Sequence, residues 1–158
     1  NNMHKHKNVQ IHNRNGFEMI KALTPPVTKR GAVLIDPSYE EKSDYLNVQN
    51  TIIEINKKWS NGIIMLWYPL LAYRENEINE MITNIQDGVR RNNANTEIVN
   101  ETLCVYEKES HVESELSELD ENNPPRLYGS GMLVINSPWK LKENCEKVIP
   151  EIEKILKN

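Results

Sequence analysis

The length, composition and charge of the chain limit what it can be. Its 158 residues are 38% hydrophobic and 27% charged, which is enough for one domain with its own core. The 23 acidic and 19 basic side chains give a net charge of −4, which argues against a strongly basic nucleic-acid-binding module. No apolar run approaches the roughly 18 residues of a membrane span, so no membrane segment is predicted.

The cysteines and histidines suggest neither disulfides nor a metal site. Cys104 and Cys145 lie far apart and form no Cys-x-x-Cys pair, so we expect reduced thiols in a cytoplasmic protein. His4 and His6 form a His-x-His pair in a polar opening without a visible signal peptide. No third ligand stands near this pair, so no metal is predicted.

Hydrophobic periodicity predicts alternating strands and helices. The predicted strands cover 9–12, 31–35, 63–68, 97–107 and 131–136. The predicted helices cover 17–23, 43–59, 75–89 and 139–156. Residues 108–126 are acidic and end in Asn-Asn-Pro-Pro, which predicts a solvated loop insertion. This order predicts one α/β domain over 1–158, with a mostly parallel sheet and helices on both faces.

Three predicted strands end in polar or aromatic residues beside a proline. These endings are Asp36-Pro37-Ser38-Tyr39, Trp67-Tyr68-Pro69 and Asn136-Ser137-Pro138-Trp139. Ligands of open α/β sheets bind at the carboxyl ends of strands. We therefore expect Asp36 at the carboxyl end of a central parallel strand, facing a cleft shared with Trp67, Tyr68 and Asn136. A carboxylate beside aromatic faces suits an amino group on a flat base. Taken singly, Asp-Pro is also a common turn opener, and the aromatic residues are also ordinary packing residues.

The first of these endings resembles a methyltransferase motif. Asp36-Pro37-Ser38-Tyr39 is similar to the [DNS]-P-P-[YFW] motif of adenine-N6 and cytosine-N4 methyltransferases, with Ser38 in place of the second proline. Further segments resemble, in order and spacing, the RlmJ-type family of bacterial 23S ribosomal RNA adenine-N6 methyltransferases. These segments are Asn15-Gly16-Phe17, Pro25-Pro26, Arg30-Gly31, 34–40, Gly62, Trp67-Tyr68-Pro69 and 130–141.

This resemblance implies a Rossmann-like class I fold, S-adenosylmethionine as cofactor and an adenine of 23S ribosomal RNA as substrate. It assigns catalysis to Asp36, Pro37 and Tyr39, and cofactor binding to Asn15, Gly16 and Asp36. Asn15 stands where the family has an aspartate, so an amide replaces a carboxylate. The expected substrate-binding residues are Tyr39, Trp67, Tyr68, Asn136 and Trp139.

The resemblance also implies that the chain corresponds to the C-terminal portion of such a catalytic domain. The family's N-terminal part, with the first cofactor-binding strand, has no counterpart in these 158 residues. We expect a monomer at full length, and an uncovered sheet face or edge in this portion alone. Two alternatives stay open, a DNA adenine-N6 methyltransferase and a non-catalytic α/β binding protein. The exchanges at Asn15 and Ser38 favour the second.

Overall fold

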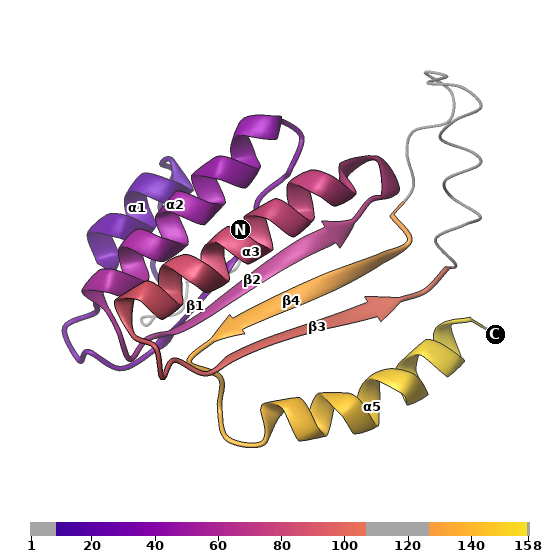
Figure 1. Cartoon of the computed structure of the whole chain (residues 1–158). Helices are drawn as coiled ribbons and strands as arrows, with labels where there is room; N and C mark the ends of the chain where they lie inside the picture. The colour runs from indigo at the N-terminus through magenta and orange to yellow at the C-terminus, as the bar shows by residue number, and fades with distance from the viewer. Residues whose placement is uncertain (1–8, 107–126, 158) are drawn as a thin grey trace.

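The computed structural model describes residues 9–106 and 127–157 (Figure 1). Its elements are α1 (Gly16–Leu23), β1 (Ala32–Ile35), α2 (Lys42–Lys58), β2 (Ile63–Leu70), the 3-10 helix η2 (Ala72–Arg74), α3 (Glu75–Asn92), β3 (Ile98–Cys104), β4 (Gly129–Ile135) and α5 (Leu141–Leu156). All four predicted helices and four of the five predicted strands are confirmed, with shifted ends.

The predicted strand over 9–12 is wrong. Val9 and Ile11 are 42% and 44% exposed, and residues 9–12 pair with no strand in the described part of the chain. Alternation of apolar residues is thus insufficient to form a strand at 9–12, because no described strand lies beside these residues to pair with them. The predicted loop over 108–126 and the pair His4 and His6 lie outside the described residues.

The sheet has four strands in the order β1-β2-β4-β3. β1 runs parallel to β2, with Ala32 opposite Ile63 and Ile35 opposite Leu66, whereas β4 runs antiparallel to β2 and β3. The prediction of a mostly parallel sheet is therefore wrong for the described strands. The chain leaves β3 at Cys104 and enters β4 at Gly129, and these two residues are register partners. The chain therefore enters β4 at the same end of the sheet at which it left β3, and the two strands run antiparallel.

Helices lie on both faces of this sheet, as predicted. Figure 1 shows α1, α2 and α3 on one face and α5 on the other. Apolar residues at helical spacing on α2 and α3 pack against the inward residues of β2 and β4. The fully buried members of this core include Val48, Ile52, Ile55, Ile64, Leu66, Met81, Ile85, Val89, Leu133 and Ile135. None of the described helices is long and apolar enough to cross a bilayer.

Candidate functional site

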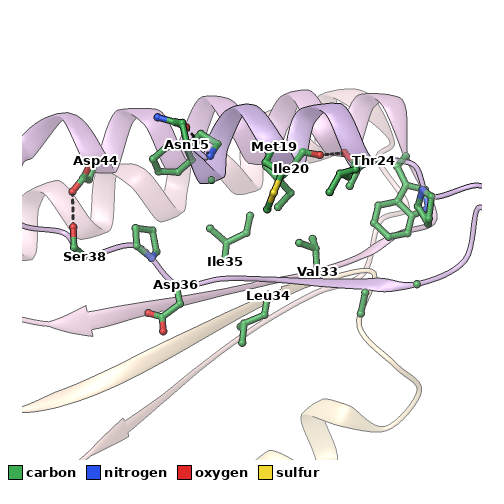
Figure 2. A pocket seen from close by; sticks show the side chains of 18 of the residues that line it. Asn15, Met19, Ile20, Thr24, Val33, Leu34, Ile35, Asp36, Ser38 and Asp44 are labelled. Atoms are coloured by element: carbon green, nitrogen blue, oxygen red, sulfur yellow. Dashed lines mark hydrogen bonds between the residues drawn. The ribbon is translucent and has the colours of Figure 1, made fainter. Parts of the chain in front are cut away.

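A cavity of about 690 Å³ lies between α1 and β1 (Figure 2). Its walls are apolar side chains of the two elements, Phe17, Met19, Ile20, Leu23, Val33, Leu34 and Ile35. Six polar residues also line it. Figure 2 shows Asn15, Asp36, Ser38 and Asp44 toward one end and Thr24 toward the other, and the sixth polar residue is Arg30. The cavity follows the lateral edge of β1 that pairs with no described strand. An apolar hollow with a few polar groups at one end is typical of small-molecule sites.

Asn15 and Gly16, the predicted cofactor pair, open helix α1 at the polar end of the cavity. The Asn15 side-chain oxygen accepts hydrogen bonds from the backbone amides of Phe17 (2.9 Å) and Glu18 (3.1 Å), so Asn15 is the N-cap of the helix. A Cβ atom built on Gly16 would meet nothing within 4 Å. The chain itself therefore does not require glycine at this position.

Asp36 lies directly after the last residue of β1, at the carboxyl end of the strand as predicted, but β1 is an edge strand of the described sheet and not the central strand expected. Figure 2 shows Leu34 and Asp36 on one side of β1 and Val33 and Ile35 on the other, toward α1. The Asp36 side chain is exposed. Ser38 follows in the same turn, and its hydroxyl donates to the Asp44 carboxylate across 3.5 Å, which links the turn to the start of α2.

Tyr39 differs from the expectation that its ring stacks on a base. The residue has φ of 56° and is only 4% exposed, so its ring is part of the core. The ring centroid lies 5.1 Å from that of Tyr45 and 6.5 Å from that of Trp67. The Tyr39 hydroxyl donates to the Trp67 carbonyl at 2.9 Å. Burial, followed by the charges of Tyr45 and Asp36, raises the pKa of Tyr39 above its ordinary value.

The left-handed backbone turns the Tyr39 side chain back toward the sheet, where it connects the end of β1 to β2. Left-handed backbone is uncommon for a bulky residue, and such strain often occurs at functional sites. Tyr39 therefore holds the turn that carries Asp36.

Trp67 and Tyr68 separate onto opposite faces of β2, because successive strand residues alternate. Leu66 pairs with Ile35, so Trp67 comes next to Asp36 at the same end of the sheet, as predicted. Tyr68 instead points into the core, 2% exposed, and its hydroxyl donates to the Asn100 side-chain oxygen at 2.8 Å. The structure thus brings Trp67, but not Tyr68, toward the predicted site.

Asn136 and Trp139 lie at the opposite end of the sheet from Asp36, so the predicted shared cleft is wrong. β4 is antiparallel to β2, and Ile135 is opposite Ile64 near the start of β2. The Asn136 side-chain amide donates to the carbonyls of Ser60 (3.0 Å) and Gly62 (2.7 Å). The sequence signal for this reversal is the acidic stretch between β3 and β4, which lacks the apolar period of a crossover helix.

Trp59 belongs to the cavity but was not predicted there. Its ring lines the end near Gly31 and is 3% exposed, and its indole N–H donates to the Lys29 carbonyl at 3.0 Å. The periodicity of α2 identifies Trp59 as a core position, and only the structure places it against the loop before β1. Among the described residues, no three His, Cys, Asp or Glu side chains gather in the manner of a metal site.

Comparisons with known proteins agree on one family. The family model described as RsmJ, "Ribosomal RNA large subunit methyltransferase D, RlmJ", matches residues 1–158. Ribosomal RNA large subunit methyltransferase J of Escherichia coli K12 is 33% identical over 147 residues, which are 92% of this chain and 45% of that protein. The protein of the same name from Haemophilus influenzae is 31% identical over 157 residues, 99% of this chain and 48% of its own length.

A crystal structure shows a similar fold. Protein LPL1258 from Legionella pneumophila matches with a TM-score of 0.67 and 22% identity, over 91% of this chain and 46% of that one. The chain thus spans about half the length of the relatives it matches. Because the family model covers all 158 residues, the chain belongs to the RlmJ family of ribosomal RNA large subunit methyltransferases.

Proposed function

We propose that the protein transfers a methyl group from S-adenosylmethionine to the exocyclic N6 nitrogen of an adenine in 23S ribosomal RNA. The observation that carries the proposal is that Asp36, at the carboxyl end of β1, lines one cavity with Asn15 and Gly16 in a chain of this family. The fold in this proposal is a Rossmann-like class I methyltransferase whose sheet continues beyond β1. Support for this continuation comes from the unpaired edge of β1 in the described part and from relatives about twice as long.

The cavity fits S-adenosylmethionine in size and chemistry. Its volume of about 690 Å³ falls within the range of small-molecule pockets. Asn15 and Gly16 would hold the cofactor at the amino end of α1, and the carboxylates of Asp36 and Asp44 suit its positively charged sulfonium group. S-adenosylmethionine, when bound, supplies the methyl group. Gly16 in this proposal lets the ligand approach the backbone.

Asp36 and Pro37 activate the acceptor. The adenine N6 lone pair is delocalised into the ring, which makes the nitrogen a poor nucleophile. The Asp36 carboxylate and the Pro37 carbonyl each accept one N–H of the amino group, and so localise the lone pair on nitrogen. Asp36 then takes the proton that the nitrogen loses. Trp67, on the neighbouring strand, packs against the base, and Tyr39 fixes the turn.

The test uses the full-length protein and the Asp36→Asn variant. We expect methyl transfer to unmodified 23S ribosomal RNA to fall at least about 100-fold, because the amide cannot accept the proton. S-adenosylmethionine affinity, measured by calorimetry, should stay within about tenfold, or 1.4 kcal/mol. Asp87→Asn, at an exposed position of α3, is the matched control and should behave as wild type.

Three outcomes oppose the proposal. Wild-type turnover by Asp36→Asn excludes the role of Asp36. Transfer to adenine in DNA but not to 23S ribosomal RNA favours a DNA methyltransferase. Cofactor binding without transfer to either nucleic acid favours a non-catalytic binding protein.

A further inference from the structure

Carboxylates predominate at one end of the sheet and cations at the other, although Lys42 stands at the first end and Glu97 at the second. The segment 36–44, at the carboxyl end of β1, carries four carboxylates, Asp36, Glu40, Glu41 and Asp44. The opposite end, where β1, β2 and β3 begin, carries exposed cations next to those strands. We name this set the basic rim. It consists of Lys29, Arg30, Lys57, Arg90, Arg91 and Lys140.

Hydrogen bonds join the segments of the basic rim into one surface. Trp59, just after the end of α2, donates to the Lys29 carbonyl at 3.0 Å, which ties α2 to the loop before β1. The Asn92 side chain donates to Asn56 at 3.0 Å, which ties the ends of α3 and α2 together. Asn136 donates to Gly62 at 2.7 Å, which ties the β4–α5 turn to the start of β2.

Local structure does not account for all of these cations. Lys57, Arg90 and Arg91 lie in the last turns of helices, where the helix dipole favours positive charge. Lys140 is the N-cap of α5, where the dipole disfavours a cation, and its side chain makes no capping hydrogen bond. Lys29 and Lys140 both have left-handed backbones, with φ of 55° and 63°. No ion pair joins the six to any carboxylate of residues 9–106 and 127–157.

Trp139 stands on the same turn as Lys140 and is 84% exposed. The Lys140 ammonium lies 4.2 Å from the centroid of its ring, which leaves most of the indole open to solvent. An exposed aromatic face among unpaired cations suits single-stranded nucleic acid, because the ring stacks on a base while the cations meet phosphates.

We propose that the basic rim and Trp139 form a second contact for the RNA substrate, at the opposite end of the sheet from Asp36. Lys and Arg side chains contact phosphates, and Trp139 stacks on an unpaired base. This inference rests on the proposed function. Asp36 lies level with Trp67, so four residue steps of β2, about 13 Å, separate the two contacts along the sheet, a span that a folded ribosomal RNA bridges. The acidic segment at Asp36 then selects the target base while the rim supplies electrostatic affinity.

The experiment compares two triple variants of the full-length protein. The rim variant is Arg90→Ala with Arg91→Ala and Lys140→Ala, because Arg30 also lines the proposed cofactor cavity, and the control is Lys147→Ala with Lys154→Ala and Lys157→Ala on or beside α5. Filter binding measures affinity for unmodified 23S ribosomal RNA between about 50 and 200 mM KCl. For the rim variant we expect at least about tenfold weaker binding and a salt slope shallower by about 2, and for the control a slope within about 0.5 of wild type.

Two further measurements sharpen the test. Trp139→Ala should weaken binding to the same RNA about tenfold, and Trp139→Phe should restore most of it, because phenylalanine keeps an aromatic face. The rim variant should bind S-adenosylmethionine within about twofold of wild type, because the cofactor does not reach the rim on this proposal.

Equal losses in the rim and control variants would overturn the proposal, and so would a wild-type salt slope in the rim variant. Failure of the proposed function is separate. It appears as a wild-type protein that does not methylate 23S ribosomal RNA, whatever the rim variant does in binding.

Discussion

Tyr39 supports the site through the hydrogen bond of its hydroxyl group, which the Tyr39→Phe variant removes. Its hydroxyl donates to the Trp67 carbonyl at 2.9 Å, and its ring is 4% exposed. In Tyr39→Phe the ring packing stays, but the buried carbonyl loses its partner. We expect the free energy of unfolding to fall by about 1–2 kcal/mol at neutral pH, measured by urea unfolding of the full-length protein. Methyl transfer should fall too, because the turn carrying Asp36 loosens.

The raised pKa of Tyr39 gives this prediction a pH dependence. The unfolded chain releases the tyrosine proton near its ordinary pKa of 10.0, whereas the folded protein keeps it to higher pH. Stability is therefore fully present below pH 10 and is lost as the pH rises, by up to about 1.4 kcal/mol per pH unit for one group. Tyr39→Phe should lose less stability between pH 9 and 11 than wild type. Equal losses in both proteins would contradict the burial of this hydroxyl.

At the scale of elements, the packing of β2 against β4 depends on Gly131, because the Tyr68 ring lies over its Cα atom. These two residues are register partners, and a Cβ atom on Gly131 would overlap the Tyr68 ring. The ring cannot move freely, because its hydroxyl donates to Asn100 on β3 at 2.8 Å. We expect Gly131→Ala to lower the free energy of unfolding by about 1–3 kcal/mol.

The matched control is Gly16→Ala, since a Cβ on Gly16 meets nothing within 4 Å of the chain. This variant should unfold like wild type or at slightly higher urea concentration, because alanine is the better helix former. Similar destabilisation in both variants would show that glycine is required in these positions for a reason other than the Tyr68 contact.

The elements of this fold could be predicted from local pattern, but their directions could not. Val48, Ile52 and Ile55 mark α2 by helical spacing, and the apolar run from Ile63 marks β2. The antiparallel course of β4 depends on where the chain returns after Cys104. The one sequence sign of it, the lack of an apolar helical period between β3 and β4, does not by itself fix the direction of the strand. Asn136 was therefore expected at the wrong end of the sheet. Tyr39 was expected at the surface because the sign of its φ depends on the turn, which the residue types alone do not fix.

At the scale of the whole molecule, the segment that lies beside β1 determines how the cofactor cavity is closed. In the described part, β1 has a parallel neighbour on one side only, and Leu34 is 57% exposed. An unpaired strand with exposed apolar residues is an edge that proteins normally cover or pair. The relatives are about twice as long as this chain, so their additional residues are the natural source of a covering strand.

Hydrogen exchange can test this directly. If a further strand pairs with β1 in a protein of the relatives' length, the amides of Val33, Leu34 and Ile35 that face the open edge become hydrogen-bonded and exchange slowly. In the 158-residue chain alone they should exchange at least about tenfold faster, because opening then costs about 1.4 kcal/mol less. Amides of β4, which has a neighbour on each side, provide the internal reference and should be protected in both proteins. Equal exchange of the β1 amides in the two proteins, with β4 protected in both, would mean that the sheet ends at β1 and that the cofactor cavity is bounded by something other than a continuing sheet.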